Sequence, residues 1–271
     1  MGEPLATTGG AALGARHAAA GLLLAAAAMA AVFLVAQRGR ARGRPAPAAA
    51  TAPEPFYEGQ DAAVREAARA VSSDPAIGAL LSNDGLVRRF TQAVTDLGDG
   101  TAPTGTLSFL APRQPFRVKR DGARTVIDAR SYARYDALAD VVRSLDAAAC
   151  ARAFRRLEPL FEACYRDLGH PHGGFRFALA RAAARVRAVP VPEGELEVVP
   201  RVHMAVANAG LPESAALVYE LADPRLEALS PAQKLLLRIG PRNARIVQSI
   251  TDEVARALDL PLDPAAAGRQ P

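Results

Sequence analysis

Residues 147–168, AAACARAFRRLEPLFEACYRDL, decide the fold because they carry the most regular apolar pattern in the chain. Large apolar side chains recur there every three or four residues, the spacing of one face of an α-helix. Asp146 can cap its start and Gly169 its end, and Pro159 should kink it because proline lacks the N–H donor. We predict that this helix is the central element of the domain. Its apolar positions are Cys150, Phe154, Leu157, Phe161, Cys164 and Leu168.

Outside that stretch the pattern predicts a mainly α domain with at most one small β-hairpin. The hairpin is expected at 116–128, around Asp121-Gly122, and Glu195–Val199 could form a further strand. The stripe at 86–97 has Ser82 and Asn83 as capping candidates, with Gly98 at its end. Helices are expected near residues 64–71, 86–97, 135–145, 175–189, 213–222, 231–239 and 242–258.

An uncharged segment near the N-terminus predicts a membrane anchor. Residues 18–36, AAAGLLLAAAAMAAVFLVA, have nearly the length of about 20 residues that a helix needs to cross a bilayer, and Arg38 follows at once. A cleaved signal peptide, or a buried soluble helix, is the alternative. The interpretation divides the chain into a tail (1–17), a transmembrane helix (18–36), an Arg then Pro/Ala linker (37–56), a helical domain (57–258) and a disordered tail (259–271).

The basic charge is concentrated beside that segment. The formal net charge is +5 over 271 residues, but residues 1–56 hold five arginines and two glutamates, 5 − 2 = +3, which leaves +2 for the remainder. A domain so close to balance makes nucleic acid an unexpected partner. The arginines after the span favour a cytoplasmic domain, by the positive-inside rule.

The sequence predicts no disulfide, no metal site and no cofactor. Cys150 and Cys164 lie 14 residues apart on one predicted helix, about 21 Å, which is too far for a disulfide. His170-Pro-His172 lacks the two close ligand pairs of a zinc site. Glu158 and Glu162 share a helix face as paired acids would, but neighbouring arginines explain them as solvated ion pairs. Nucleophile and phosphate-loop motifs are absent from the sequence.

Residues 236–247, LLRIGPRNARIV, are similar to the second half of a helix-hairpin-helix DNA-binding motif. Gly240, Pro241 and Ala244 fit its turn, whereas Arg238 stands where the first turn glycine belongs. In this interpretation Gly240, Pro241, Arg242 and Arg245 would contact phosphate. The simpler interpretation is one helix that ends at Gly240 and another that starts at Pro241.

A longer resemblance extends over most of residues 60–258. The segments that carry it are LSNDGLVRRF (81–90), FRV (116–118), SYARYDALADVVRSLD (131–146), RRLEPLFEACYRDLG (155–169) and LADPRLEALSPAQKLLLRIGPRNARIV (221–247). Together they resemble the bacterial domain-of-unknown-function family 3014, whose members are single-span membrane proteins. The chain departs from the family at Gly169-His-Pro-His-Gly173, where the family tends to have G-Y-P-[DE]-G.

The resemblance implies a helical domain on an inner-membrane anchor, with no assigned activity. It favours the periplasm, against the arginine count, so the side of the membrane stays open. We expect a non-enzymatic envelope protein that contacts the bilayer through 18–36 and binds another protein or itself. The alternatives are a membrane-tethered nucleic-acid binder and an enzyme of unrecognised type. The candidate binding residues are Tyr132, Tyr135, Asp136, Glu158, Glu162, Tyr165, Gly240 and Arg242.

Overall fold

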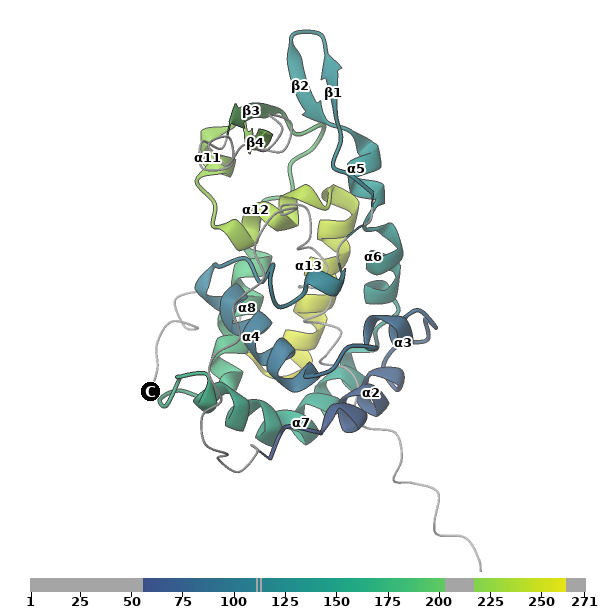
Figure 1. The fold of residues 1–271 in the computed structure, drawn as a ribbon, viewed down its shortest axis with the longest axis vertical. Helices are drawn as coiled ribbons and strands as arrows, with labels where there is room; N and C mark the ends of the chain where they lie inside the picture. Colours follow the sequence, from purple (N-terminus) through teal and green to yellow (C-terminus); the bar gives the residue numbers. More distant parts are fainter. Residues whose placement is uncertain (1–55, 111, 113, 203–216, 262–271) are drawn as a thin grey trace, which may run out of the picture.

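The computed structural model describes residues 56–110, 112, 114–202 and 217–261. This part of the chain is mainly helical, as the sequence predicts, with two small β-sheets (Figure 1). The elements in chain order are α2 (Asp61–Arg69), α3 (Ile77–Leu80), α4 (Leu86–Asp99), the 3-10 turn η1 (Ser108–Leu110), β1 (Val118–Asp121), β2 (Arg124–Ile127), α5 (Ala129–Ala133), α6 (Asp136–Arg143), α7 (Ala147–Asp167), α8 (Phe175–Arg187), β3 (Val198–Val202), β4 (Leu217–Leu221), α11 (Pro224–Glu227), α12 (Pro231–Arg238) and α13 (Pro241–Ala257).

The apolar stripe of residues 147–168 forms α7, and its large side chains enter the core. The Asp146 carboxylate caps the helix by accepting a hydrogen bond from the Ala149 N–H, and the helix runs on through Pro159. The ring of Phe161 lies 4.5 Å from that of Phe90 on α4 and 5.5 Å from that of Phe175 on α8, between ring centroids. This aromatic cluster joins three helices and confirms the predicted burial of the stripe.

The central position belongs to α8 together with α13, rather than to α7. α8 packs against α4, α7, α12 and α13, whereas α7 runs along the end of the molecule away from the β1–β2 hairpin (Figure 1). Small side chains explain the difference, because Ala178, Ala182 and Ala183 are buried on α8 and let neighbouring backbones approach closely. A prediction of the central helix from the largest apolar side chains favours α7 and overlooks α8, whose buried side chains are mostly alanines.

The prediction of at most one hairpin is wrong. The β1–β2 hairpin forms at the expected place, with Asp121 opposite Arg124. A second antiparallel pair joins β3 to β4, and β4 occupies part of the region expected as a helix near 213–222. The two pairs meet where the Ile127 N–H donates to the Leu196 carbonyl. The strand expected at Glu195–Val199 overlaps β3, but its partner β4 lies beyond a long connection, and the pattern of neighbouring residues does not reveal such a pairing.

The start of α4 is capped by another helix instead of by Ser82 or Asn83. The Asp61 carboxylate of α2 accepts hydrogen bonds from the backbone N–H groups of Gly85 and Leu86, both at 2.7 Å. Gly100, in the left-handed conformation, ends α4 two residues beyond the predicted Gly98. α2 therefore fixes the direction in which α4 enters the core.

The predicted anchor 18–36, the tail 1–17 and nearly all of the linker 37–56 lie outside the described residues, as does most of the tail 259–271. Among the helices that the structure describes, none combines the length and the apolar character required to cross a bilayer.

Candidate functional site

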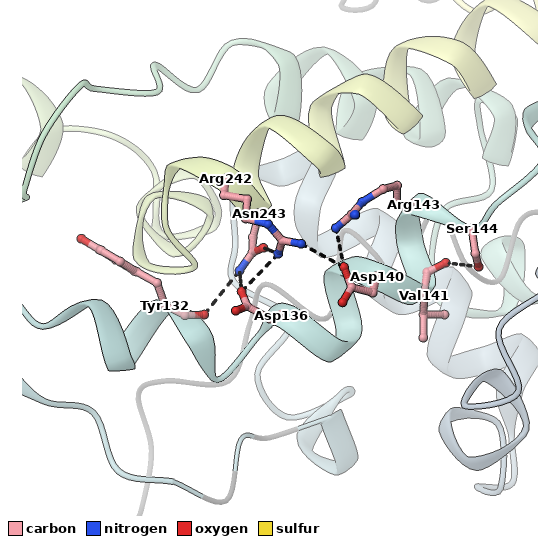
Figure 2. A network of polar contacts seen from close by, with 8 residues as sticks. All are labelled: Tyr132, Asp136, Asp140, Val141, Arg143, Ser144, Arg242 and Asn243. Carbon is pink, nitrogen blue, oxygen red and sulfur yellow. Dashed lines mark hydrogen bonds and ion pairs between the residues drawn. The ribbon is translucent and has the colours of Figure 1, made fainter.

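Candidate residues that are far apart in the sequence meet where α5 and α6 pack against the start of α13 (Figure 2). Tyr132 and Asp136 come from the first pair of helices, and Gly240 and Arg242 from the α12–α13 turn. They are joined by Asn243, which the sequence analysis missed. We call these five residues the α6–α13 junction.

Asn243 is buried at the centre of the junction, where its side chain bonds residues of both α5 and α6. Its Nδ2 donates to the Asp136 carboxylate at 2.9 Å and to the Tyr132 backbone carbonyl at 3.3 Å. A third acceptor, the Ile239 carbonyl, lies 3.2 Å from the same nitrogen. The residue is 1% exposed, and both of its buried amide hydrogens therefore have acceptors. Its position three residues after Gly240, on the first turn of α13, is the signal that could have identified it.

Arg242 adds an ion-pair layer on the solvent side of the junction. Its guanidinium donates to Asp136 at 3.3 Å and to Asp140 at 3.0 Å, and Arg143 also bonds Asp140 (Figure 2). About half of the Arg242 and Asp136 side chains is exposed, 52% and 47%. The pair is therefore screened by water and contributes at most about 1 kcal/mol. Asp140, one helical turn after Asp136, is a second residue that the sequence analysis missed.

Gly240 lies directly against the ring of Tyr132. Its φ and ψ are 89° and 159°, a region that is essentially restricted to glycine. A Cβ at this position would lie 2.6 Å from Tyr132 Cγ and 2.8 Å from Tyr132 Cβ. Gly240 is thus required by packing, and burial of the ring raises the pKa of Tyr132 to about 12. The phenol stays neutral at physiological pH.

Tyr135 is buried beside the junction among cations. Only 2% of the residue is exposed, and burial raises the pKa of its hydroxyl. The Arg134 guanidinium carbon lies 5.4 Å from the Tyr135 ring centroid and 5.6 Å from that of Phe116. Burial in turn lowers the pKa of Arg134. These contacts hold the α5–α6 turn against the segment that leads into β1.

Glu158, Glu162 and Tyr165 form a separate group, where α7 meets α8. The Glu162 carboxylate accepts a hydrogen bond from the Phe175 N–H at 2.6 Å and so caps the start of α8. Glu158 pairs with Arg176 of α8 at 3.8 Å, and burial raises the pKa of Glu158. The Tyr165 ring stacks on His170, with centroids 4.3 Å apart.

The start of α13 carries the two arginines that a phosphate-binding turn would use, but one of them, Arg242, is already paired with carboxylates. The turn contains Gly240 and Pro241 in the positions expected from the sequence, and Arg245 is exposed. Arg242, however, bonds two carboxylates of α6. A phosphate at this helix end would approach the negative charge of those two carboxylates.

Neither cysteine has the environment of a nucleophile. Cys150 and Cys164 are 0% exposed, and burial raises the pKa of the Cys150 thiol to about 12. A thiol of this kind stays protonated and unreactive at neutral pH. Both belong to the apolar face of α7, as the sequence predicts.

A small apolar cavity adjoins Gly240. It is lined by residues that include Leu196, Leu237 and Ala244, and it has a volume of about 10 Å³. That volume is at the lower limit for a single water molecule.

Comparisons with known proteins identify the family. The model of the family described as "Protein of unknown function (DUF3014)" matches residues 86–254, which include every candidate residue above. Neither the curated proteins nor the solved structures contain a match to the chain. Because the matched region covers more than half of the sequence, the chain belongs to the DUF3014 family.

Proposed function

We propose that this protein is a membrane-anchored, non-enzymatic interaction module of the cell envelope. One observation carries the proposal: every carboxylate among the candidate residues bonds a group on another helix. Asp136 accepts from Asn243, and Glu162 accepts from the Phe175 N–H. Glu158 pairs with Arg176. These acids therefore have a structural role, because each joins two helices through a hydrogen bond or an ion pair.

A structural role predicts a different energetic behaviour from a catalytic role. A catalytic carboxylate is held in a site that costs stability, so its replacement by the amide leaves stability unchanged or raises it. A structural carboxylate contributes to stability, and its replacement by the amide weakens the hydrogen bond or ion pair that joins two helices. The two roles can therefore be separated without a known substrate.

The test is a thermal melt of the full chain in detergent for Asp136→Asn, Glu158→Gln and Glu162→Gln. We expect each variant to lower Tm, with Glu162→Gln the largest effect because the neutral amide is a weaker cap for α8. Glu66→Gln, at an exposed position of α2, is the matched control. Unchanged or raised Tm for all three variants would favour an enzyme.

The membrane part of the proposal is supported by the sequence of residues 18–36 and by the family resemblance. We infer one crossing of the inner membrane, with the domain held by the linker 37–56, and we favour the periplasmic side. Carbonate-washed membranes should retain the full-length protein, whereas release of a shorter soluble form would contradict the anchor. A reporter fused after Pro271 that is active on one side only would identify the side.

The expected partner is another envelope protein or a second copy of the chain. Two differently tagged full-length copies, expressed together, should co-purify from detergent-solubilised membranes after crosslinking if the chain self-associates. If instead each crosslinked product contains one of the two tags and a different protein, the partner is another envelope protein. Recovery of uncrosslinked single chains alone would contradict the interaction role.

A further inference from the structure

We propose that the outer face of α7 lies against an anionic lipid surface. Four arginines of this helix are exposed, and together they define what we call the arginine face: Arg152, Arg155, Arg156 and Arg166. The inference rests on the proposed membrane anchor and adds the surface through which the domain meets the bilayer.

The four side chains point in nearly one direction. At 3.6 residues per turn they fall within an arc of about 100° around the helix axis. The arc extends over 14 residues, from Arg152 to Arg166, which is about 21 Å along the axis. Pro159 and Ala148, both exposed, lie on the same arc. The opposite side of the helix carries Phe154 and Phe161, which are buried in the core.

The positive charge of this face is not balanced by ion pairs. None of the ion pairs among the described residues includes any of the four arginines. Arg155 instead donates to the Ala257 carbonyl at 2.8 Å, and Arg166 to the Glu162 carbonyl at 3.3 Å. Both acceptors are neutral.

The acids of α7 lie beside this arc rather than within it. Glu158 and Glu162 are engaged with α8, as described above, and Arg155 is a further positive neighbour of Glu158. Asp167 is exposed at the C-terminal edge of the face and interacts with Tyr57. A flat, negatively charged surface therefore complements the arginine face over most of its length.

The chain also enters the domain at this helix. Tyr57 is buried, at 2% exposed, and it interacts with Cys164 and Asp167 near the end of α7. The preceding Phe56 is 59% exposed, the larger of the two exposed large apolar side chains among the described residues. An exposed apolar ring at the point where the chain enters the domain suits a segment that lies at a membrane interface.

A tether at this position would present the arginine face to the bilayer. The linker 37–56 joins the proposed span to Phe56 and would reach about 60 Å when extended. It is therefore long enough to let the face lie flat on the lipid. The β1–β2 hairpin, at the other end of the molecule (Figure 1), would then point away from the membrane.

The test measures which end of the domain faces the lipid in the full-length protein. Ala148→Cys places a dye on the arginine face, and Ala123→Cys places it at the exposed tip of the hairpin. The two native cysteines are buried and stay unlabelled in the folded protein. Energy transfer to an acceptor on lipid headgroups is measured in vesicles of phosphatidylcholine, with or without phosphatidylglycerol, after flotation.

With phosphatidylglycerol present we expect stronger transfer from position 148 than from position 123. The difference should disappear at 1 M salt, where charges are screened within about 3 Å, and in phosphatidylcholine alone. It should also be lost in Arg152→Gln/Arg155→Gln/Arg156→Gln. The control with the same loss of charge, Arg117→Gln/Arg120→Gln/Arg225→Gln, replaces exposed arginines elsewhere and should keep it.

Failure of the face and failure of the anchor give different results. Protein that floats with both kinds of vesicle but shows equal transfer from the two positions would overturn the arginine face, and an acidic protein would then be its better partner. Protein that floats only with phosphatidylglycerol, and no longer floats after the triple substitution, would support the face and contradict the anchor.

Discussion

Replacing Gly240 by alanine should destabilise the domain more than any other Gly→Ala change at its helix ends. The new Cβ would lie 2.6–2.8 Å from Tyr132 Cγ, Cβ and Cδ1. These atoms are at the base of the side chain, so a rotation of the ring does not relieve the overlap. The backbone conformation at φ 89°, ψ 159° adds about 1–3 kcal/mol, and the overpacking adds about 1–3 kcal/mol.

The sum, about 2–6 kcal/mol, is a large part of the stability of an ordinary domain. For a domain of this size it corresponds to a fall in Tm of roughly 5–20 °C, measured by circular dichroism on the full chain in detergent. Gly85→Ala is the control, because Gly85 also has a positive φ, 69°, but a Cβ there meets nothing within 4 Å. Its cost should be about 1–2 kcal/mol.

The overlap can be separated from the backbone cost with a double-mutant cycle. Tyr132→Ala removes two of the three atoms that the new Cβ would meet. Gly240→Ala should therefore cost less in the Tyr132→Ala background than in the wild type. Equal costs in the two backgrounds, or a Gly240→Ala melt that matches the Gly85→Ala melt, would refute the packing argument.

Three further predictions follow from the core, the hairpin end and the thiols. Phe161→Asp should abolish the cooperative thermal melt, because it buries an unpaired charge at a 0% exposed position, whereas Ala148→Asp at an exposed position of α7 should keep it. Hydrogen bonds from Arg130 lower the pKa of Asp128 to about 2 from 3.8. The ionised carboxylate therefore stabilises the fold fully above about pH 4, and this contribution is lost as the pH falls towards about 2. Between about pH 4 and about pH 2 the Tm of the wild type should fall more steeply than the Tm of Asp128→Asn. Cys150 and Cys164 should react with a thiol reagent at neutral pH only after denaturation, and reaction of the native protein would contradict their burial.

The sequence determined the elements that depend on neighbours along the chain. The spacing of Phe154 and Phe161, together with the Asp146 cap, was sufficient for α7 because helix formation and amphipathicity are local properties. Asp121-Gly122 likewise predicted the β1–β2 hairpin, and Gly240-Pro241 the break between α12 and α13. The family resemblance extended over the same elements and is confirmed.

Only the tertiary structure decided which distant residues form hydrogen bonds or strand pairs with one another. The β3–β4 pair, the capping of α4 by Asp61 and the capping of α8 by Glu162 each join groups from different parts of the chain. The same holds for Asp136 and Asn243, 107 residues apart. Chain folding brings such donors and acceptors together, and their side chains give no periodic signal of their partners. The sequence thus identified polar residues worth testing, and the packing of the helices brought them into contact with their partners on other helices.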